Sequence, residues 1–249
     1  MKFSLILALV LFLMIAPSCV KNESTQIDIE SDKTYFPLQI GKFVEFEADS
    51  ILFRQGMFLD SVRFFAREEI VSQSMDSLGI YYTILRSQRK KTTEAWLPTA
   101  TYTARILGQK AIRNESNLFF IKLVFPLTIG SSWNGLAYVN TDQIFDVEGE
   151  SIEVYQDWES FRIREPAGTF ISGTLNFTEV ITVLQTDEDN IISRRYAVEK
   201  YAKGVGLVYK EMIILDCNAT VNDCSRTTLP WRSRATKGYI FRQQVTKYN

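Results

Sequence analysis

The chain has 249 residues, 46% hydrophobic and 13% aromatic, which is enough apolar material for a sizeable core and argues against disorder. Its 28 Lys and Arg residues against 29 Asp and Glu give a net charge of −1, so we expect no nucleic-acid partner. Histidine is absent, which excludes catalytic triads and zinc motifs that need one.

The first residues are typical of an export signal. Lys2 supplies a positive charge, and residues 3–15 (FSLILALVLFLMI) are apolar except for Ser4. This run fits the core of a signal sequence, which is about 7–15 residues long, and is shorter than the ~20 residues that span a bilayer as a helix. We therefore expect residues 1–18 to be a signal peptide with a helical apolar core.

The residue after this segment is a cysteine. The small residues Ala16 and Ser18 before Cys19 resemble the lipobox of bacterial lipoproteins. In that family the cysteine sulfur receives a diacylglycerol, the signal is cut before it, and the new amino group is acylated. The resemblance implies lipid attachment at Cys19 and a membrane partner held through acyl chains. Ordinary secretion is the alternative, and it would leave an exposed thiol open to oxidation.

The segment that follows is polar. Residues 20–34 (VKNESTQIDIESDKT) contain neither Gly nor Pro and lack the apolar spacing of a helix face or a useful strand. We interpret residues 19–34 as a flexible, lipidated tether. Val20 stands where enteric lipoproteins retained at the inner membrane carry Asp, which favours the outer membrane and leaves the leaflet open.

The rest of the chain has the pattern of β-strands. Residues 42–53 (KFVEFEADSILF) open with side chains that alternate between two faces, as in a half-buried strand. Further runs rich in β-branched and aromatic residues cover residues 57–71, 79–86, 100–107, 117–124, 144–155, 161–164, 169–184, 191–198, 206–215 and 237–245. We predict an all-β domain over residues 35–249, with antiparallel sheets forming a half-barrel, barrel or sandwich, because sheets of this size avoid open edges.

Two short strings recur about 90 residues apart. Residues 36–41 (FPLQIG) and 125–130 (FPLTIG) share Phe-Pro-Leu-x-Ile-Gly, followed by an aromatic residue. Pro fixes φ and Gly permits a left-handed turn, so each string predicts an extended segment, a tight turn and then a strand. A duplication into two halves, 35–123 and 124–249, is one interpretation; chance recurrence of a convenient turn is the other.

The two remaining cysteines stand close together. Cys217 and Cys224 lie in the polar stretch DCNATVNDCS, seven positions apart. In an oxidising periplasm they could close a hairpin tip as a disulfide. A zinc site would need further ligands, and two cysteines at this spacing without partners indicate one only weakly. We favour the disulfide, in a structural role.

Longer motifs carry a resemblance. The lipobox, the string YFPLxxG from Tyr35, EPAGTF at residues 165–170 and YAKGVGLVYKE at residues 201–211 resemble uncharacterised β-rich bacterial lipoproteins frequent in Bacteroidetes. Where those relatives often have Trp in the first string, this chain has Phe43, and Trp133 fills the equivalent place in the second. The resemblance implies a periplasmic or surface β-domain on a lipid tether. It transfers no catalytic residue.

Residues that could hydrolyse glycans, bind calcium or line a groove are present, but their spacing matches no established motif. Paired carboxylates of the kind glycosidases use could come from Glu148, Glu150, Glu153, Asp157 and Glu159. The run Asp187–Asp189 lacks the glycine and distal glutamate of a calcium loop. Residues 86–91 and 232–234 are basic clusters, which we interpret as solvated turns. Four tryptophans could line a groove or fill the core: Trp96, Trp133, Trp158 and Trp231.

These observations lead to one expected function and two alternatives. We expect a lipid-anchored cell-envelope β-domain at the outer membrane that acts as a non-enzymatic binding or scaffold module, without cofactor or metal, for a protein, glycan or lipid ligand. A carrier of lipid or lipoprotein with an apolar cavity is the first alternative. A glycan hydrolase that depends on two carboxylates is the second.

Overall fold

The computed structural model describes residues 28–54, 57–58, 61–158 and 160–249. The expected signal peptide and Cys19 lie outside these residues. Within the described ranges, no helix has both the length and the apolar character needed to cross a membrane.

Nearly all of the described chain is antiparallel β-strand, which confirms the predicted fold class. The strands are β1 (Phe43–Arg54), β2 (Met57–Phe58), β3 (Val62–Asp76), β4 (Gly79–Arg89), β5 (Leu97–Leu107), β6 (Lys110–Glu115), β7 (Leu118–Val124), β8 (Ser132–Trp133), β9 (Ile144–Val147), β10 (Glu150–Glu153), β11 (Phe161–Ser172), β12 (Leu175–Asp189), β13 (Ser193–Ala202), β14 (Gly206–Asp216) and β15 (Lys237–Tyr248). Short helices are α2 (Ile29–Lys33) and α3 (Trp231–Arg234).

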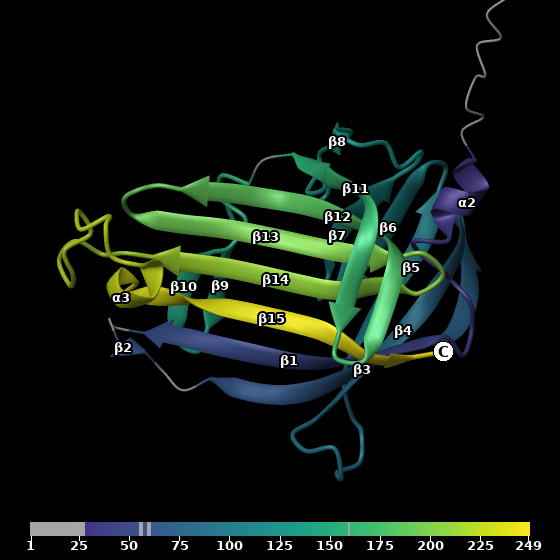
Figure 1. Cartoon of the computed structure of the whole chain (residues 1–249), viewed down its shortest axis with the longest axis horizontal. Coiled ribbons are helices and arrows are strands. Elements are labelled where there is room, and N and C mark those ends of the chain that lie inside the picture. The colour runs from purple at the N-terminus through teal and green to yellow at the C-terminus, as the bar shows by residue number, and fades with distance from the viewer. Residues whose placement is uncertain (1–27, 55–56, 59–60, 159) are drawn as a thin grey trace, which may run out of the picture.

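Thirteen of the strands in the described residues form one sheet that follows the chain almost in order. Its order is β7-β6-β5-β4-β3-β1-β15-β14-β13-β12-β11-β8, with β2 paired to β1 at the side. The first and last long strands therefore lie side by side, with Phe46 opposite Val245 (Figure 1). One antiparallel meander bends round until its two ends approach each other.

A short seam between β7 and β8 nearly closes this sheet into a barrel. The amide of Ile121 on β7 donates to the carbonyl of Gly135 at 2.9 Å. The indole Nε1 of Trp133 donates to the carbonyl of Ile121 at 2.8 Å, and Trp133 itself pairs with Phe161 on β11. Of the three shapes left open by the sequence, the described chain comes nearest to the barrel, because this connection satisfies edge groups that an open sheet would expose.

The end of the expected tether is structured, which corrects its boundary. Residues 29–33 form α2, which Asp28 caps by accepting from the Ser31 amide at 3.0 Å. Asp32 accepts from the amide of Leu127 at 2.7 Å, and Ile29 packs against the barrel core. The sequence of this segment is polar because Ile29 is the one apolar side chain that docks it, while Asp32 holds it through a hydrogen bond. Figure 1 shows α2 against the end of the barrel. A tether as predicted therefore ends before residue 28, not at residue 34.

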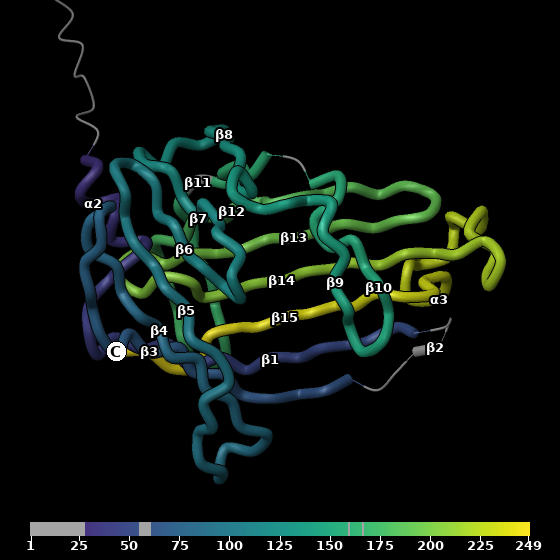
Figure 2. Tube along the Cα trace, turned by 180° about the vertical axis from the view of Figure 1, so that it is seen from behind, coloured from purple at the N-terminus to yellow at the C-terminus, as the bar shows by residue number. Residues whose placement is uncertain are grey.

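A separate hairpin covers one side of the barrel. Strands β9 and β10 pair only with each other, and they cross the barrel in the view from behind (Figure 2). Ile152 and Val154 are buried against Ala197 and Ile214 on the barrel wall. The single strand predicted over residues 144–155 is thus split, because Gly149 has φ +86° and turns the chain back.

Both Phe-Pro-Leu-x-Ile-Gly strings form turns of the expected kind. Gly41 and Gly130 have φ values of +85° and +79°. Their amides donate to strand carbonyls, of Ile70 at 2.8 Å and of Ile163 at 3.0 Å. The first string leads into β1 and the second into β8, the first strand of each half of the meander. The two halves share one sheet, and duplication stays a hypothesis.

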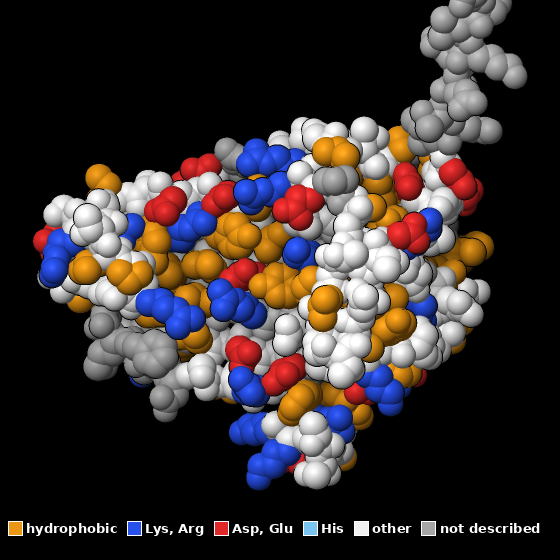
Figure 3. Space-filling view, viewed as in Figure 1, with side chains coloured by type: hydrophobic (Ala, Val, Ile, Leu, Met, Phe, Trp, Pro, Cys, Tyr) orange, Lys and Arg blue, Asp and Glu red, His pale blue; other side chains and the backbone are white. Residues whose placement is uncertain are grey.

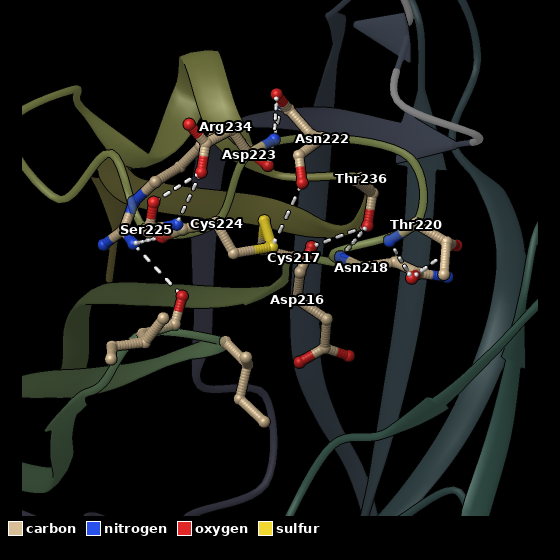
Figure 4. Close-up of a disulfide and its surroundings, with 12 residues drawn as sticks. Asp216, Cys217, Asn218, Thr220, Asn222, Asp223, Cys224, Ser225, Arg234 and Thr236 are labelled. Carbon is tan, nitrogen blue, oxygen red and sulfur yellow. Dashed lines mark hydrogen bonds between the residues drawn. A yellow bond between two sulfur atoms is a disulfide. The ribbon is translucent and has the colours of Figure 1, made fainter.

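Cys217 and Cys224 are joined in a disulfide beside α3 (Figure 4). The basic cluster at residues 232–234 was predicted to be solvated, and for Arg234 this is wrong, since its side chain is buried. Its guanidinium donates to the carbonyls of Cys224 at 3.3 Å and Ile191 at 3.2 Å. Arg234 therefore ties the disulfide loop to the β12–β13 turn.

Candidate functional site

The barrel holds a cavity of about 790 Å³ beneath the β9–β10 hairpin. One wall is the sheet and the other is the hairpin with the residues that follow it. The apolar and aromatic lining consists of Leu52, Val62, Phe64, Leu118, Phe145, Val147, Val154, Tyr155, Met212, Tyr239 and Phe241. Polar groups come from Ser50, Glu115, Ser116, Asp146, Glu148 and Lys210.

Strand alternation explains which side chains reach the cavity. Ser50 and Leu52 on β1, Lys210 and Met212 on β14, and residues 239 and 241 on β15 are each two positions apart, so each pair shares one face of its strand. The hairpin adds Phe145 from the opposite side, and its ring lies edge-on to Tyr155 with ring centroids 5.5 Å apart. An aromatic pocket results from strands that are distant in sequence.

At its inner end the cavity meets a cluster of seven buried or half-buried charges, which we call the charge cluster. Its members are Glu68, Arg86, Arg113, Glu115, Lys122, Glu199 and Lys210. Glu68 bridges two arginines, with Arg86 at 2.6 Å and Arg113 at 2.8 Å. These side chains are about 10% exposed, so the ion pairs are screened little by solvent.

The other carboxylates of the charge cluster lie between the two lysines. Glu199 is 2.9 Å from Lys122 Nζ and accepts the hydroxyl of Tyr201 at 2.6 Å. Glu115 is 3.3 Å from Lys122 Nζ and 2.9 Å from Arg113. Lys210 Nζ is 3.5 Å from both carboxylates. Each carboxylate therefore has at least two cationic neighbours.

These neighbours keep the carboxylates ionised. Burial by itself would raise the pKa of Glu115, but attraction by Lys122, Lys210 and Arg113 outweighs it and holds the pKa well below 4.5. The same balance lowers the pKa of Glu68 and of Glu199. Burial opposes the charge of Lys210, yet attraction by Glu115 and Glu199 raises its pKa. All of these groups are therefore charged at neutral pH.

The charge cluster also borders a second, smaller cavity of about 70 Å³ on its other side. That space is lined by Phe36, Pro37 and Leu38 from the first Phe-Pro-Leu string and by charged members of the cluster. Glu115 lines both cavities. The cluster thus forms a polar partition across the barrel, with the large cavity on one side and the α2 end on the other.

The outer surface carries its charges differently. On the face of the sheet seen in Figure 3, basic and acidic side chains are interspersed with apolar ones.

The carboxylates proposed from sequence for hydrolysis are not brought together as a set. Glu148 lines the cavity rim, whereas Glu150 and Glu153 lie on β10 and do not line it. Asp157 has a φ of +60° in the turn after the hairpin, and Glu159 lies outside the described residues.

The acidic residues considered for calcium binding and the tryptophans considered for a groove contact other protein side chains instead. Asp187 is 2.7 Å from Arg194, and Asp189 accepts the indole N–H of Trp231 at 2.9 Å. Within the described ranges no group of three acidic or cysteine side chains is placed to hold a metal. The tryptophans are dispersed: Trp133 at the seam, Trp158 against Tyr155, Trp96 under Arg89 and Trp231 under Arg234.

The charge cluster was not predictable from the sequence pattern. Arg86 was interpreted as part of a solvated turn, which is wrong, because it is buried inside the barrel and paired with Glu68. One signal was present: Lys210 lies between Val208 and Met212 at the spacing of a single strand face, so a cation shares an apolar face. Its partner Glu115 lies 95 positions away, and sequence gave no reason to join the two.

Comparisons with known proteins find little. No family model matches the chain, and no curated protein matches it. Two solved structures are similar. One, described as an exported protein with a YmcC-like fold from Bacteroides fragilis, is 9% identical with a TM-score of 0.44, over 86% of this chain and 97% of that one. The other, described as a lipoprotein from Parabacteroides distasonis, is 8% identical with a TM-score of 0.42, over 86% of this chain and 98% of that one. Likenesses this slight leave the cavity and its charges as the basis for a functional proposal.

Proposed function

We propose that this chain is a lipid-anchored envelope protein whose β-domain is a non-enzymatic binding module for a small amphipathic ligand. The observation that carries the proposal is the cavity of about 790 Å³, lined mainly by apolar and aromatic side chains. Pockets for small molecules are commonly about 300–1,000 Å³, mostly apolar, with a few polar groups that fix orientation. A scaffold that acts only through its outer surface would need no such space.

The charges argue for binding over hydrolysis. Glu115 is a half-buried carboxylate of the cavity, and its cationic neighbours hold its pKa well below 4.5. A general acid needs a proton near neutral pH, which requires a raised pKa. Lys210 and Glu115 are therefore suited to orienting a polar group.

The cavity also favours the lipid carrier among the alternatives. An acyl chain or a similar apolar body would contact Phe64, Phe145 and Phe241, while its polar end would meet the charge cluster. A carrier differs from a simple binding module only because it later releases its ligand to a membrane or partner. We propose the binding step, which both require.

The anchor places this module near a bilayer. Acylation of Cys19 would leave nine residue steps between the lipid and Asp28, which span at most about 30 Å. Two or three acyl chains give stable attachment, since each buried CH₂ contributes about 0.8 kcal/mol. The proposal puts this bilayer at the outer membrane.

A cavity-filling variant tests the binding site. The probe is N-phenyl-1-naphthylamine, a neutral apolar dye, titrated into the exported chain carrying Cys19→Ser so that no lipid interferes. We expect micromolar binding that Leu52→Trp combined with Met212→Trp weakens at least tenfold. Ile171→Trp is the matched control, because Ile171 is 68% exposed. Unchanged binding by the double variant would remove the cavity from the proposal.

Metabolic labelling tests the anchor. Cells that express the full chain are given radiolabelled palmitate, and the protein is isolated by immunoprecipitation. We expect label in the native chain, none in Cys19→Ser, and recovery of the native chain with outer-membrane fractions. Equal labelling of both forms would refute lipidation at Cys19.

A further inference from the structure

We infer that the ligand of the large cavity carries an anionic head group, which lies against Lys210, while its apolar body occupies the aromatic part of the cavity. This inference rests on the proposed function and names the chemical class of its ligand. It depends on the count of charges in the cluster and on the position of one lysine.

The charge cluster is not neutral. Four cations, Arg86, Arg113, Lys122 and Lys210, face three carboxylates, Glu68, Glu115 and Glu199. The tyrosines beside them do not supply the missing anion, because burial raises the pKa of Tyr155 and of Tyr201 and keeps both hydroxyls protonated. Buried charges are normally paired, since removing an ion from water is costly. One positive charge is left over within the described barrel.

Lys210 is the cation best placed to meet an added anion. Its Nζ lies 3.5 Å from Glu115 and from Glu199, beyond the 2.7–3.2 Å of a normal hydrogen bond. The other cations make contacts of 2.6–2.9 Å. Among these four cations, Lys210 alone lines the large cavity, and 16% of its side chain is exposed. Its N–H groups therefore retain donor capacity toward that space.

The remaining lining sets the orientation of the ligand. Asp146 and Glu148 lie on the β9–β10 hairpin, and they would repel an anion placed near the hairpin. The aromatic side chains of β15 and the hairpin favour an apolar body. An acid with a hydrocarbon or aromatic tail therefore fits with its head toward Lys210 on β14, away from the two carboxylates of the hairpin.

A matched pair of probes tests this inference. The first is 11-(dansylamino)undecanoic acid and the second is its methyl ester, which has the same fluorophore and chain without the charge. Both are titrated into the exported Cys19→Ser chain. We expect the acid to bind at least tenfold more tightly than the ester. Equal binding of acid and ester would overturn the anionic head group and leave the binding module standing, whereas binding of neither probe would overturn both.

Two variants and a control locate the effect. Lys210→Met leaves three cations against three carboxylates. We expect it to bring the affinities for the acid and for the ester to within about twofold of each other. Lys203→Met removes an equal charge from an exposed site and should change neither affinity. Ser50→Asp adds an anion to the cavity wall, so it should weaken binding of the acid and leave binding of the ester unchanged. An undiminished preference for the acid in both Lys210→Met and Ser50→Asp would overturn the role of Lys210.

Discussion

Lys122 and Glu199 form an ion pair in the barrel interior, with Nζ 2.9 Å from Oε1 and side chains only 4% and 1% exposed. Glu199 also accepts the Tyr201 hydroxyl, and Lys122 also approaches Glu115. Both side chains are almost fully shielded from bulk solvent, so a lost partner is poorly replaced. The stability of the barrel should therefore depend on keeping this pair intact.

Removing both charges of the pair should cost less than the two single removals added together. We expect Glu199→Gln to lower the free energy of unfolding by about 3–5 kcal/mol, because it leaves buried cations without a counter-charge. The double variant Lys122→Met with Glu199→Gln should lose less than the sum of the losses in the single variants Lys122→Met and Glu199→Gln. Urea unfolding of all four proteins measures this. Additive losses would show that the pair is not coupled.

Acid should unfold the protein through the same cluster. The pKa values of Glu68, Glu115 and Glu199 are lowered in the folded state, so the unfolded chain takes up more protons as the pH falls. Their contribution to stability is complete above pH 4.5 and is lost as the pH falls below that value. Urea midpoints measured from pH 7 to pH 3 should be level at first and then decline steeply. A midpoint that rises toward pH 3 would contradict this account.

The seam should be sensitive to a single methyl group. A Cβ added at Gly135 would lie 2.2 Å from the buried ring of Phe161, so Gly135→Ala must displace either the ring or the seam. We expect a loss of about 2–3 kcal/mol in the free energy of unfolding and faster hydrogen exchange at the Ile121 amide. Gly173→Ala is the control, since nothing lies within 4 Å of its added Cβ and only its positive φ costs about 1 kcal/mol. Equal losses from the two substitutions would argue against a tight seam.

The disulfide should contribute to stability without contributing to binding. Cys217 and Cys224 close a loop with a sequence separation of seven, and neither lines the cavity. Replacing both by Ser should cost about 2–3 kcal/mol, because the unfolded chain regains the freedom of that loop. Thermal unfolding measures the loss, and titration with N-phenyl-1-naphthylamine should give an unchanged affinity. A changed affinity would place the loop in the binding mechanism.

The sequence by itself determined the class of fold and several local turns. Alternating and β-branched runs are read residue by residue, because a strand places every second side chain on one face whatever it pairs with. Gly41 and Gly130 were predictable as left-handed turns for an equally local reason. The spacing of Cys217 and Cys224 also pointed to a pair that the structure joins.

Only the tertiary structure decided the closed shape, the cavity and the charge cluster. Lys122 and Glu199 are 77 positions apart, and nothing near either residue specifies the other. An inward-facing charge is buried or solvated according to which strand lies opposite it. The pairing of β1 with β15 and the β7–β8 seam decide which strands face each other. The same closure leaves space beneath the β9–β10 hairpin, since no local pattern requires the opposing side chains to fill it.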